Sequence, residues 1–555
     1  MIIVTETKDP IKGSLIYEYR RTPSQKKMGV PEAIRAISIV FGIKRLTKQK
    51  LEEIPVDALY FDLPSLMHTT AQRTYAYGPY ENEKRQRELA EFTDAELEEA
   101  YYVELLDSLV EAIRIASPRR LIYIGMDGVP VFAKVVQQRQ RRFMTQQSLL
   151  FDSNRITVGT DFMDRLAIRI RTWIGEFMSE NKSNADIIFS DHHETGEAEH
   201  KIADYIRYVN AATHGTAQTH VIHGLDTDLF FIALLMKNAV VYLWNSREGN
   251  FPQILDVEAA RDTIRHTIGT NEAPVSFVTA LTLLGNDFIP RHKSLEDFVT
   301  SIRTIIEALK ARDIATFSDG GVRVLWKPFM QFLSVMGQHE NTLALAAGHR
   351  THSNIVAANM HNNQFDFAKY ASDYRALVAT HDYEGDLTKV VRRYLELIAW
   401  TMHYYTQGSA TLNTWLYYDH YYPPLLVDLA RIAPSVVADV ARTAAWNAKT
   451  VDQSFLHPFQ LMVAVLPQRS FYLMPQAIER VVKSHIKSSS KWRNLYPAAI
   501  ERDLDGYNVA HTAPTFVPFM TPSMSQAIEV PTLSTDYSQR YYSHNTINDI
   551  EEFIV

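Results

Sequence analysis

LYFD, at residues 59–62, is the first of four short apolar runs that decide the fold of this chain. LIYIGM at 121–126, DIIFS at 186–190 and HVIH at 220–223 follow it, with helical patterns between them. Short β-rich runs that alternate with helices are typical of a parallel sheet covered by helices. We therefore predict an α/β fold, with a mostly parallel sheet flanked by helices, from residue 59 to about residue 235.

The longest helical pattern in this region runs from about Asp94 to Ala116. Thr93 and Glu96 have the spacing of a capping box, in which two side chains satisfy backbone N–H groups at the start of a helix. The apolar residues that recur on one face are Leu97, Leu105, Leu109 and Ile113. The sequence therefore predicts a helix here, between the first two strands.

Acidic residues gather where the predicted strands end. The carboxyl ends of parallel strands lie along one edge of the sheet, where open α/β folds place their ligands, so these side chains are expected to converge. Two of the acids follow the fourth strand two residues apart, and we expect them to point to the same side of it. The full set, with two glutamates after DIIFS and one aspartate in GNDFIP, is Asp62, Asp127, Glu197, Glu199, Asp226, Asp228 and Asp287.

Convergent carboxylates repel one another unless a cation neutralises them. Hard oxygen ligands suit Mg²⁺, with Mn²⁺ as a substitute. Two such ions ~4 Å apart can activate a water, orient a scissile phosphate and stabilise the leaving oxygen. A single aspartate at a strand end is more often a helix cap or a surface residue, but seven in this order favour a metal site.

A basic helix is predicted directly after Asp127, in MDGVPVFAKVVQQRQRRF at residues 126–143. Lys134, Gln138 and Arg141 are spaced i, i+4 and i+7, which places them on one helix face, with Arg142 beside them. Such a face can bind a terminal phosphate. A solvated basic helix is an equally good interpretation of this segment alone, and its position after a metal-type acid favours phosphate binding.

The composition excludes several classes of protein. The 555 residues carry 57 Lys and Arg against 64 Asp and Glu, a net charge of −7, and no cysteine. Disulfides, thiolate zinc sites, iron–sulfur clusters and a cysteine nucleophile are therefore ruled out, as is a globally basic nucleic-acid binder. The N-terminal residues lack a signal-peptide pattern, and no apolar run approaches the ~18 residues of a spanning helix. We expect a soluble, cytoplasmic protein without a membrane partner, and the pairs Arg20-Arg21 and Lys26-Lys27 leave a nuclear location open.

The chain divides into five predicted parts. After Pro290 it becomes mostly helical and rich in aromatic residues. We expect an N-terminal extension at 1–27, a nuclease-type core at 28–310, a connecting region at 311–386, a largely helical, aromatic-rich second region at 387–522, and a polar tail at 523–555.

Taken together, these segments resemble the Xrn/Rat family of 5′→3′ exoribonucleases. The stretches that match come in the family's order through its two conserved regions, between about Met28 and Gly506. They are MGVPEAIRAIS from Met28, LYFDLPSLMH, YIGMDGVPVFAKVVQQRQRRF, FDSNRITVGTDFM, IIFSDHHETGEAEHKIADYIR, HGLDTDLF, LLGNDFIP, YLELIAWTMHYYTQG, TWLYYDHYYPP, HPFQLMVAVLP and LYPAAIERDLDG. The order and number of matches are far more specific than any single motif.

The resemblance implies a compact family member with a PIN- or 5′-nuclease-like core and two Mg²⁺ ions on the seven acids. It also implies that Lys134, Gln138, Arg141 and Arg142 form a 5′-monophosphate pocket. His68 matches the histidine that stacks on the 5′ base, and Trp415 matches the aromatic on its other face. Stacking is sequence-tolerant. The implied substrate is single-stranded RNA with a 5′-monophosphate, degraded processively to mononucleotides; protein partners stay open.

Three positions depart from the family pattern. Pro64 stands where the family usually has Asn, Phe132 where it usually has Arg, and Asn413 in place of one of two neighbouring tryptophans. The first two changes remove one ligand-orienting contact and one basic contact. The third leaves the alignment of Trp415 open by a residue or two.

Two alternatives remain at the level of sequence. A flap-type 5′ nuclease acting on DNA shares the acids at strand ends, but the second conserved region argues against it. An Xrn-like body kept as an RNA-binding or assembly component, for instance in a viral particle, is disfavoured by the intact acids. The histidines near the acids, which are His192, His193, His200 and His223, lack a zinc-ligand spacing, so we assign them to helix surfaces or to the surroundings of the acids.

Overall fold

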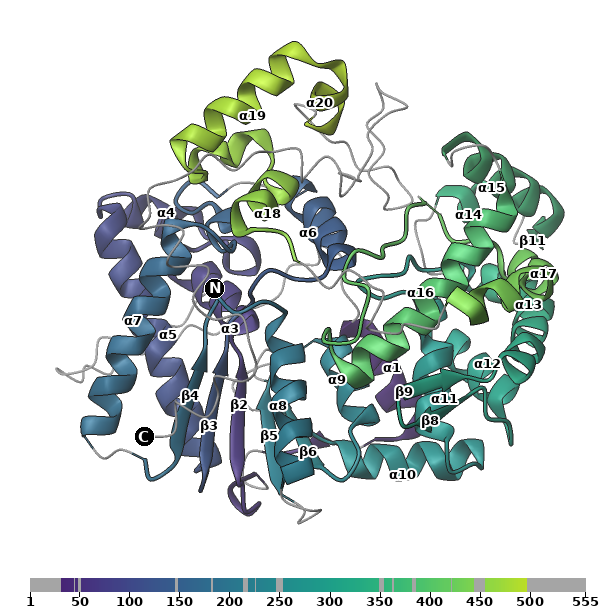
Figure 1. Ribbon diagram of the computed structural model, residues 1–555, viewed down its shortest axis with the longest axis horizontal. Helices are drawn as coiled ribbons and strands as arrows, with labels where there is room; N and C mark the ends of the chain where they lie inside the picture. The colour runs from purple at the N-terminus through teal and green to yellow at the C-terminus, as the bar shows by residue number, and fades with distance from the viewer. Residues whose placement is uncertain are drawn as a thin grey trace, which may run out of the picture.

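The computed structural model describes residues 31–496, apart from 44, 48–50, 145–147, 181–182, 213–217, 225, 246–252, 349–353, 362–363, 382–385, 421 and 444–454. The predicted N-terminal extension and C-terminal tail lie outside the described residues, and so does the end of the second region. Within the described part, a sheet with its helices occupies one half of the molecule, and a helical assembly occupies the other (Figure 1).

Seven strands form the main sheet of the described chain, in the order β1-β7-β6-β5-β2-β3-β4. The five strands from β6 to β4 are parallel, whereas β7 pairs antiparallel with both β6 and β1. Their bounds are β1 Arg45–Leu46, β2 Ala58–Asp62, β3 Leu121–Gly125, β4 Asp186–Ser190, β5 Thr219–His223, β6 Val240–Asn245 and β7 Gln253–Asp256. The predicted α/β fold and its four strands are confirmed.

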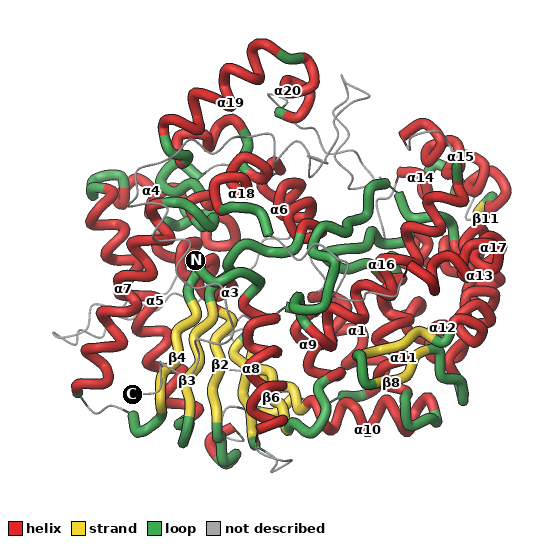
Figure 2. Tube along the Cα trace, viewed as in Figure 1, coloured by secondary structure: helices red, strands yellow, loops and turns green. Residues whose placement is uncertain are grey.

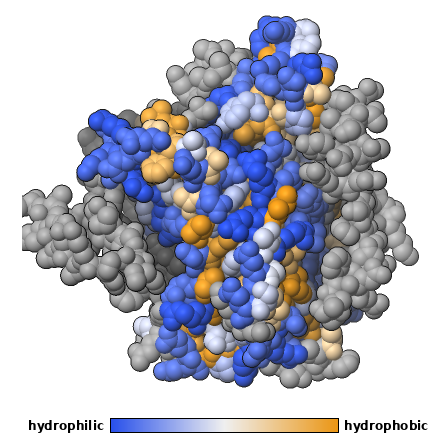
Figure 3. All heavy atoms as spheres, turned by 90° about the vertical axis from the view of Figure 1, so that its left-hand side faces the viewer, coloured by the Kyte–Doolittle hydropathy of each residue, from blue (hydrophilic) through white to orange (hydrophobic). Residues whose placement is uncertain are grey.

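Helices cover both faces of the sheet, because alternate strand residues point to opposite sides. In β2, Leu59 and Phe61 pack with α3 (Leu63–Thr74), α5 (Asp94–Ala116) and α7 (Asp161–Ser179). Tyr60 points to the other face and packs with α8 (Ala198–Ala212) and α9 (Thr227–Leu235). Figure 2 shows the strands as one layer between these two sets of helices. On the α7 side of the molecule, most of the side chains that are not drawn in grey are hydrophilic, with hydrophobic ones scattered among them (Figure 3).

The predicted helix between β2 and β3 is confirmed with its bounds. Thr93 accepts from the backbone N–H of Glu96, and the Glu96 carboxylate accepts from the backbone N–H of Thr93 at 2.8 Å. The four residues of its predicted apolar face are all buried. The short α4 (Glu83–Leu89) precedes it and begins with Asn82 as its cap.

One hydrophobic core joins the sheet to the helical half. It runs from Tyr60 and Ile222 in the sheet through the helices that follow to Leu426 and Val440. The connecting region contributes Phe332 and Met336 of α13, which packs along α17. The helices and strands of this half are α1 Pro31–Phe41, α10 Val257–Ile268, α11 Ala273–Leu281, α12 Phe298–Leu309, β8 Ala315–Ser318, β9 Gly321–Val324, α13 Trp326–Gly348, α14 Asn354–Ala357, β10 Met360–His361, β11 Gln364–Phe365, α15 Phe367–His381, α16 Leu387–Gln407 and α17 Leu426–Thr443.

A separate hydrophobic cluster holds the basic helix α6 (Phe132–Met144) against the end of the described chain. Its partners are α18 (Pro458–Val465), α19 (Gln476–Ser488) and α20 (Ser490–Leu495). The buried Arg139 donates from its guanidinium to the carbonyl of Ala464 at 2.6 Å and to the carbonyl of Leu495. Arg139 is therefore a structural residue, although it lies between the predicted phosphate-binding residues.

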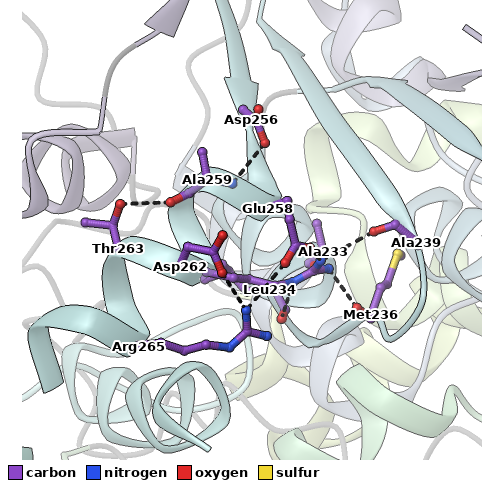
Figure 4. Close-up of polar contacts among 11 residues, drawn as sticks. Ala233, Leu234, Met236, Ala239, Asp256, Glu258, Ala259, Asp262, Thr263 and Arg265 are labelled. Atoms are coloured by element: carbon purple, nitrogen blue, oxygen red, sulfur yellow. Dashed lines mark hydrogen bonds and ion pairs between the residues drawn. The ribbon is translucent and has the colours of Figure 1, made fainter. Parts of the chain in front are cut away.

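Buried charged side chains complete two helix ends. Arg261 of α10 donates to the carbonyls of Ala233 at 2.6 Å and Met236 at 2.7 Å, where α9 ends. Figure 4 shows these carbonyls together with Glu258, which forms an ion pair with Arg261. At the start of α17, the carboxylate of Glu340 accepts from the backbone N–H groups of Leu426 at 3.0 Å and Val427 at 2.8 Å. Both sets of contacts add hydrogen-bond partners for backbone groups at helix ends, where the regular intrahelical partners run out.

None of the helices that the structure describes has the length and apolar character needed to cross a membrane.

Candidate active site

The first two acids lie where β2 and β3 end. Asp62 is the last residue of β2 and the N-cap position of α3, and Gly224 lies so close that a Cβ there would be 3.0 Å from the Cβ of Asp62. Asp127 follows β3, and its carboxylate accepts from the backbone N–H of Ala198 at 2.9 Å. Ala198 is the first residue of α8. Asp127 therefore fixes the start of the helix that carries two further acids.

Glu197 and Glu199 flank that first residue of α8, and both are buried. The expected geometry of Asp226 and Asp228 is wrong, because β5 ends at His223 and a helix begins at Thr227. Asp226 is the N-cap of α9, and its carboxylate accepts from the backbone N–H of Thr227. Asp228 lies in the first turn of α9. The two acids therefore come from a helix start and not from an extended strand.

Asp287 reaches the cluster from the loop after α11. Gln137 donates to its carboxylate at 3.2 Å, and the Lys134 amine lies 2.6 Å from its Oδ2 atom. Lys134 also forms an ion pair with Glu197. Burial disfavours the charge on Lys134, but the carboxylates of Asp287 and Glu197 raise its pKa well above the ordinary value. The structure thus places Lys134 among the acids, whereas Arg141 is exposed on the same helix.

The acids are close enough to change one another's protonation. Burial raises the pKa of Glu197 to about 7, although the amine of Lys134 opposes this effect. Burial, and then repulsion by Asp287 and Asp226, raises the pKa of Asp228 well above its ordinary value. Burial likewise raises the pKa of Glu199. Six of the seven predicted acids therefore act as one electrostatic group, which contains Asp127, Glu197, Glu199, Asp226, Asp228 and Asp287.

The donor set fits divalent cations that prefer oxygen. The Oε1 atom of Glu199 and the Oδ2 atom of Asp228 are buried and have no hydrogen-bond partner among the described residues. Buried carboxylate oxygens without a donor are costly unless a cation satisfies them. The residues that would hold such ions are the six acids of this group together with Asp62 at the end of β2.

Two tyrosines from α16 complete the cluster, and the sequence analysis missed their role. The hydroxyl of Tyr404 donates to Glu197 at 3.3 Å. The hydroxyl of Tyr405 accepts from the side-chain amide of Asn286 at 3.4 Å, and its pKa is raised first by burial and then by the charge of Asp228. The ring of Tyr404 also stacks on His200, with centroids 3.6 Å apart. Both tyrosines lie in an aromatic-rich helical stretch, a pattern typical of core packing.

The remaining predicted phosphate ligands lie further along α6. Gln138 is buried and Arg142 is half-buried. Arg142 donates to the hydroxyl of Thr157 and to the carbonyl of Ile156 at 3.2 Å. Burial, reinforced by the charge of Arg141, lowers the pKa of Arg142 to about 9. Two guanidinium groups that repel each other at one end of a helix would both be stabilised by an anion.

The structure also shows where the predicted base-stacking residues and the departures from the family pattern lie. His68 is half-buried on α3, and Pro64 occupies the first turn of that helix, where a missing N–H costs nothing. Trp415 packs on the ring of Phe132 at the start of α6, with centroids 5.5 Å apart. An aromatic contact therefore stands where the family usually has an arginine. Asn413 accepts from the indole N–H of Trp400 through its backbone carbonyl at 2.9 Å.

Comparisons with known proteins match both halves of the chain. The family model described as XRN 5'-3' exonuclease N-terminus matches residues 28–150 and 145–246, and the model described as Xrn1 helical domain matches residues 369–525. The chain is 24% identical to 5'-3' exoribonuclease 1 of Homo sapiens over 89% of its length and 33% of the human protein's. It is 26% identical to 5'-3' exoribonuclease 1 of Saccharomyces cerevisiae over 52% of its length and 21% of the yeast protein's. It is 30% identical to 5'-3' exoribonuclease 2 of Gallus gallus over 39% of its length and 24% of the chicken protein's. The chain thus spans a third or less of the length of these relatives.

Proposed function

The chain belongs to the Xrn family of 5′-3′ exonucleases, and from this premise we propose that it is a Mg²⁺-dependent, processive 5′→3′ exoribonuclease. Its substrate is single-stranded RNA with a 5′-monophosphate, and its products are mononucleotides. The observation that carries the proposal is the buried group of acids with unpartnered oxygens on Glu199 and Asp228. A scaffold has no need to bury mutually repelling carboxylates.

The reaction is hydrolysis of the first phosphodiester bond. Water adds to phosphorus, the bond to the 3′ oxygen of the first nucleotide breaks, and the next nucleotide becomes the new 5′-phosphorylated end. Two Mg²⁺ ions held by the acids would supply charge neutralisation and a lowered pKa for the attacking water. The chain itself orients the acids: Asp127 is held by the backbone N–H of Ala198, Glu197 by the hydroxyl of Tyr404, and Asp287 by Gln137.

Recognition of the 5′ end is assigned to α6. The charges of Arg141 and Arg142, with Gln138 one turn earlier, suit a terminal phosphate at the end of the helix nearest Thr157. Lys134 lies on the same helix, and its amine forms ion pairs with Glu197 and Asp287. It therefore connects this phosphate site to the acidic group. A pocket of this kind accommodates one phosphate, so capped and triphosphorylated ends are excluded.

The direct test compares labelled single-stranded RNA bearing a 5′-monophosphate, a 5′-hydroxyl or a 5′-triphosphate, with and without Mg²⁺. We expect release of mononucleotides from the 5′ end, only with Mg²⁺ and fastest with the monophosphate. A flapped DNA duplex in the same assay tests the flap-nuclease alternative. Binding of RNA without degradation would support the RNA-binding alternative and overturn the proposal.

A further inference from the structure

A second cluster of metal-type ligands lies away from the acidic group, between α7 and the loop that follows β4. Asp164 is in the first turn of α7, and His192 and His193 are in the loop. One ligand atom from each of the three residues lies within 4.8 Å of the other two. α7 and β4 are neighbours at the edge of the molecule in Figure 1. We propose that Asp164, His192 and His193 form a Zn²⁺ site that ties this loop to α7, with water as the fourth ligand.

The distances match the ligand shell of a tetrahedral ion. The Oδ1 atom of Asp164 lies 2.9 Å from Nε2 of His192 and 3.6 Å from Nε2 of His193. In a tetrahedral zinc site with bonds of ~2.0 Å, two ligand atoms are about 3.3 Å apart. The observed distances lie on either side of that value. Two imidazoles and one carboxylate are also a donor set that selects zinc over Mg²⁺.

The surroundings of His193 are those of an oriented metal ligand. Its Nδ1 atom lies 3.2 Å from the Oδ1 atom of Asp191, which also accepts from the backbone N–H of His193 at 2.9 Å. Asp191 is buried and forms an ion pair with Arg171 of α7, which fixes the carboxylate. A carboxylate on one imidazole nitrogen leaves the lone pair of the other nitrogen for a metal. Here that second nitrogen faces the carboxylate of Asp164, an arrangement that a cation between them stabilises.

His192 is the buried ligand of the proposed site. It is 1% exposed, and its Nδ1 atom has no hydrogen-bond partner among the described residues. An ion bound at Nε2 would leave this Nδ1 atom to a water molecule. The side chains of His193 and Asp164 remain 25% and 16% exposed, so an ion and a fourth ligand from water can reach the site.

The site would anchor the loop that leads to Glu197. The inner side of this loop is already tied down, because Lys201 donates to the carbonyls of Asp191 at 2.8 Å and Met126 at 3.0 Å. A zinc ion on Asp164 would tie the outer side of the same loop to α7. The role is structural, and it is independent of whether the acidic group hydrolyses RNA.

The test measures bound zinc. The purified chain and its His193→Ala and Asp164→Asn variants are dialysed against Zn²⁺ with millimolar Mg²⁺, and zinc per chain is determined by mass spectrometry of the metal. The control variant is His339→Gln, which changes an exposed histidine on α13. We expect each of the two site variants to bind about one Zn²⁺ fewer than the wild type and the control. Because the acidic group is unchanged in all four proteins, the difference reports this site alone.

A second measurement excludes loss of zinc through misfolding. Co²⁺ replacing Zn²⁺ should give the intense visible bands of a tetrahedral ion in the wild type and lose them in His193→Ala, while both proteins keep the same far-ultraviolet circular dichroism. Zn²⁺ should also raise the thermal midpoint of the wild type by about 2 °C or more and that of His193→Ala by less. Equal zinc content in wild type and variants, or a Co²⁺ spectrum without tetrahedral bands, would show a hydrogen-bonded His–Asp network and overturn the proposal.

Discussion

Replacing Asp228 can show how much the repulsion within the acidic group lowers the stability of the folded protein. It is 3% exposed, and its neighbours Asp287 and Asp226 repel its charge. We expect Asp228→Asn to abolish Mg²⁺-dependent RNA hydrolysis while keeping the size of the side chain. Without metal, the variant should be more stable than the wild type at pH 7 by about 1 kcal/mol or more, since one pKa unit corresponds to 1.36 kcal/mol.

The gain in stability of Asp228→Asn should depend on pH, because folding raises the pKa of Asp228. The pKa of Asp228 is raised by folding, so its charge opposes folding only above the ordinary pKa of 3.8. The gain should therefore shrink as the pH falls toward 4. Thermal unfolding in EDTA at the two pH values measures it, and Asp107→Ala, at an exposed position of α5, is the control. Substantial Mg²⁺-dependent hydrolysis by Asp228→Asn would contradict the metal assignment.

Arg141 separates recognition of the 5′ end from general RNA binding. We expect Arg141→Ala to reduce the preference for 5′-monophosphate over 5′-hydroxyl RNA about ten-fold or more, because a charge-assisted hydrogen bond contributes roughly 1.5–3 kcal/mol. Degradation rates of the two substrates give the ratio. Arg303→Ala, at an exposed position of α12, should leave it unchanged. An equal loss on both substrates would make α6 a general RNA-binding face.

A variant of His68 tests whether base stacking moves the RNA into the active site. A stacked base contributes ~1–3 kcal/mol, so His68→Ala should still cleave short single-stranded RNA but stall on structured RNA, where advance competes with base pairing. The measurement is the ratio of rates on structured and unstructured RNA. A parallel decrease on both, together with a lower thermal midpoint, would identify His68 as a packing residue of α3.

Among the elements, α17 depends on a carboxylate from another helix. Glu340 of α13 is fully buried and accepts from two backbone N–H groups at the start of α17. Burial raises its pKa to about 7. Because the folded state then holds a proton that the unfolded state has lost, the contribution of Glu340 to stability should fall as the pH rises from about 4.5 to 7, by roughly 2 to 4 kcal/mol.

Glu340→Gln isolates this contribution. The difference in urea midpoint between wild type and variant should change between pH 4.5 and 7. The other acids titrate in the same way in both proteins, so their effect cancels in this difference. Glu307→Gln, at an exposed position of α12, should run parallel to the wild type. A difference that is constant from pH 4.5 to 7 would mean that Glu340 is ionised throughout.

Local patterns predicted the elements well and their mutual contacts poorly. The capping box of α5 and the four strand runs depend on neighbours in sequence, so they were confirmed with nearly their full bounds. Asp226 was placed in an extended segment although it precedes an apolar helix, where an aspartate is a good N-cap. Tyr404 and Lys134 both contact Glu197, which is far from them in sequence. The spacing of apolar residues along the chain does not predict contacts of this kind.

For the whole molecule, the continuous core predicts that the nuclease-type half depends on the helical half. The apolar residues of α9, α11 and α12 pack with α13, α16 and α17. A fragment of residues 28–325 should therefore bind a hydrophobic dye and unfold without a sharp transition, because it leaves that apolar surface exposed. The full chain under the same conditions is the comparison. A fragment with cooperative unfolding and no dye binding would show that the halves fold independently.

The tyrosines of α16 also have a consequence for the order of events on the ribosome. The seven acids are all translated by residue 287, whereas Tyr404 and Tyr405 are added about 120 residues later. At 5–20 residues per second, this leaves a delay of roughly 6 to 24 s. During that interval the nascent chain carries every acid but lacks the Tyr404 hydroxyl that donates to Glu197 and the Tyr405 side chain near Asp228. The acidic group therefore stays without these two side chains until residue 405 has been added to the chain.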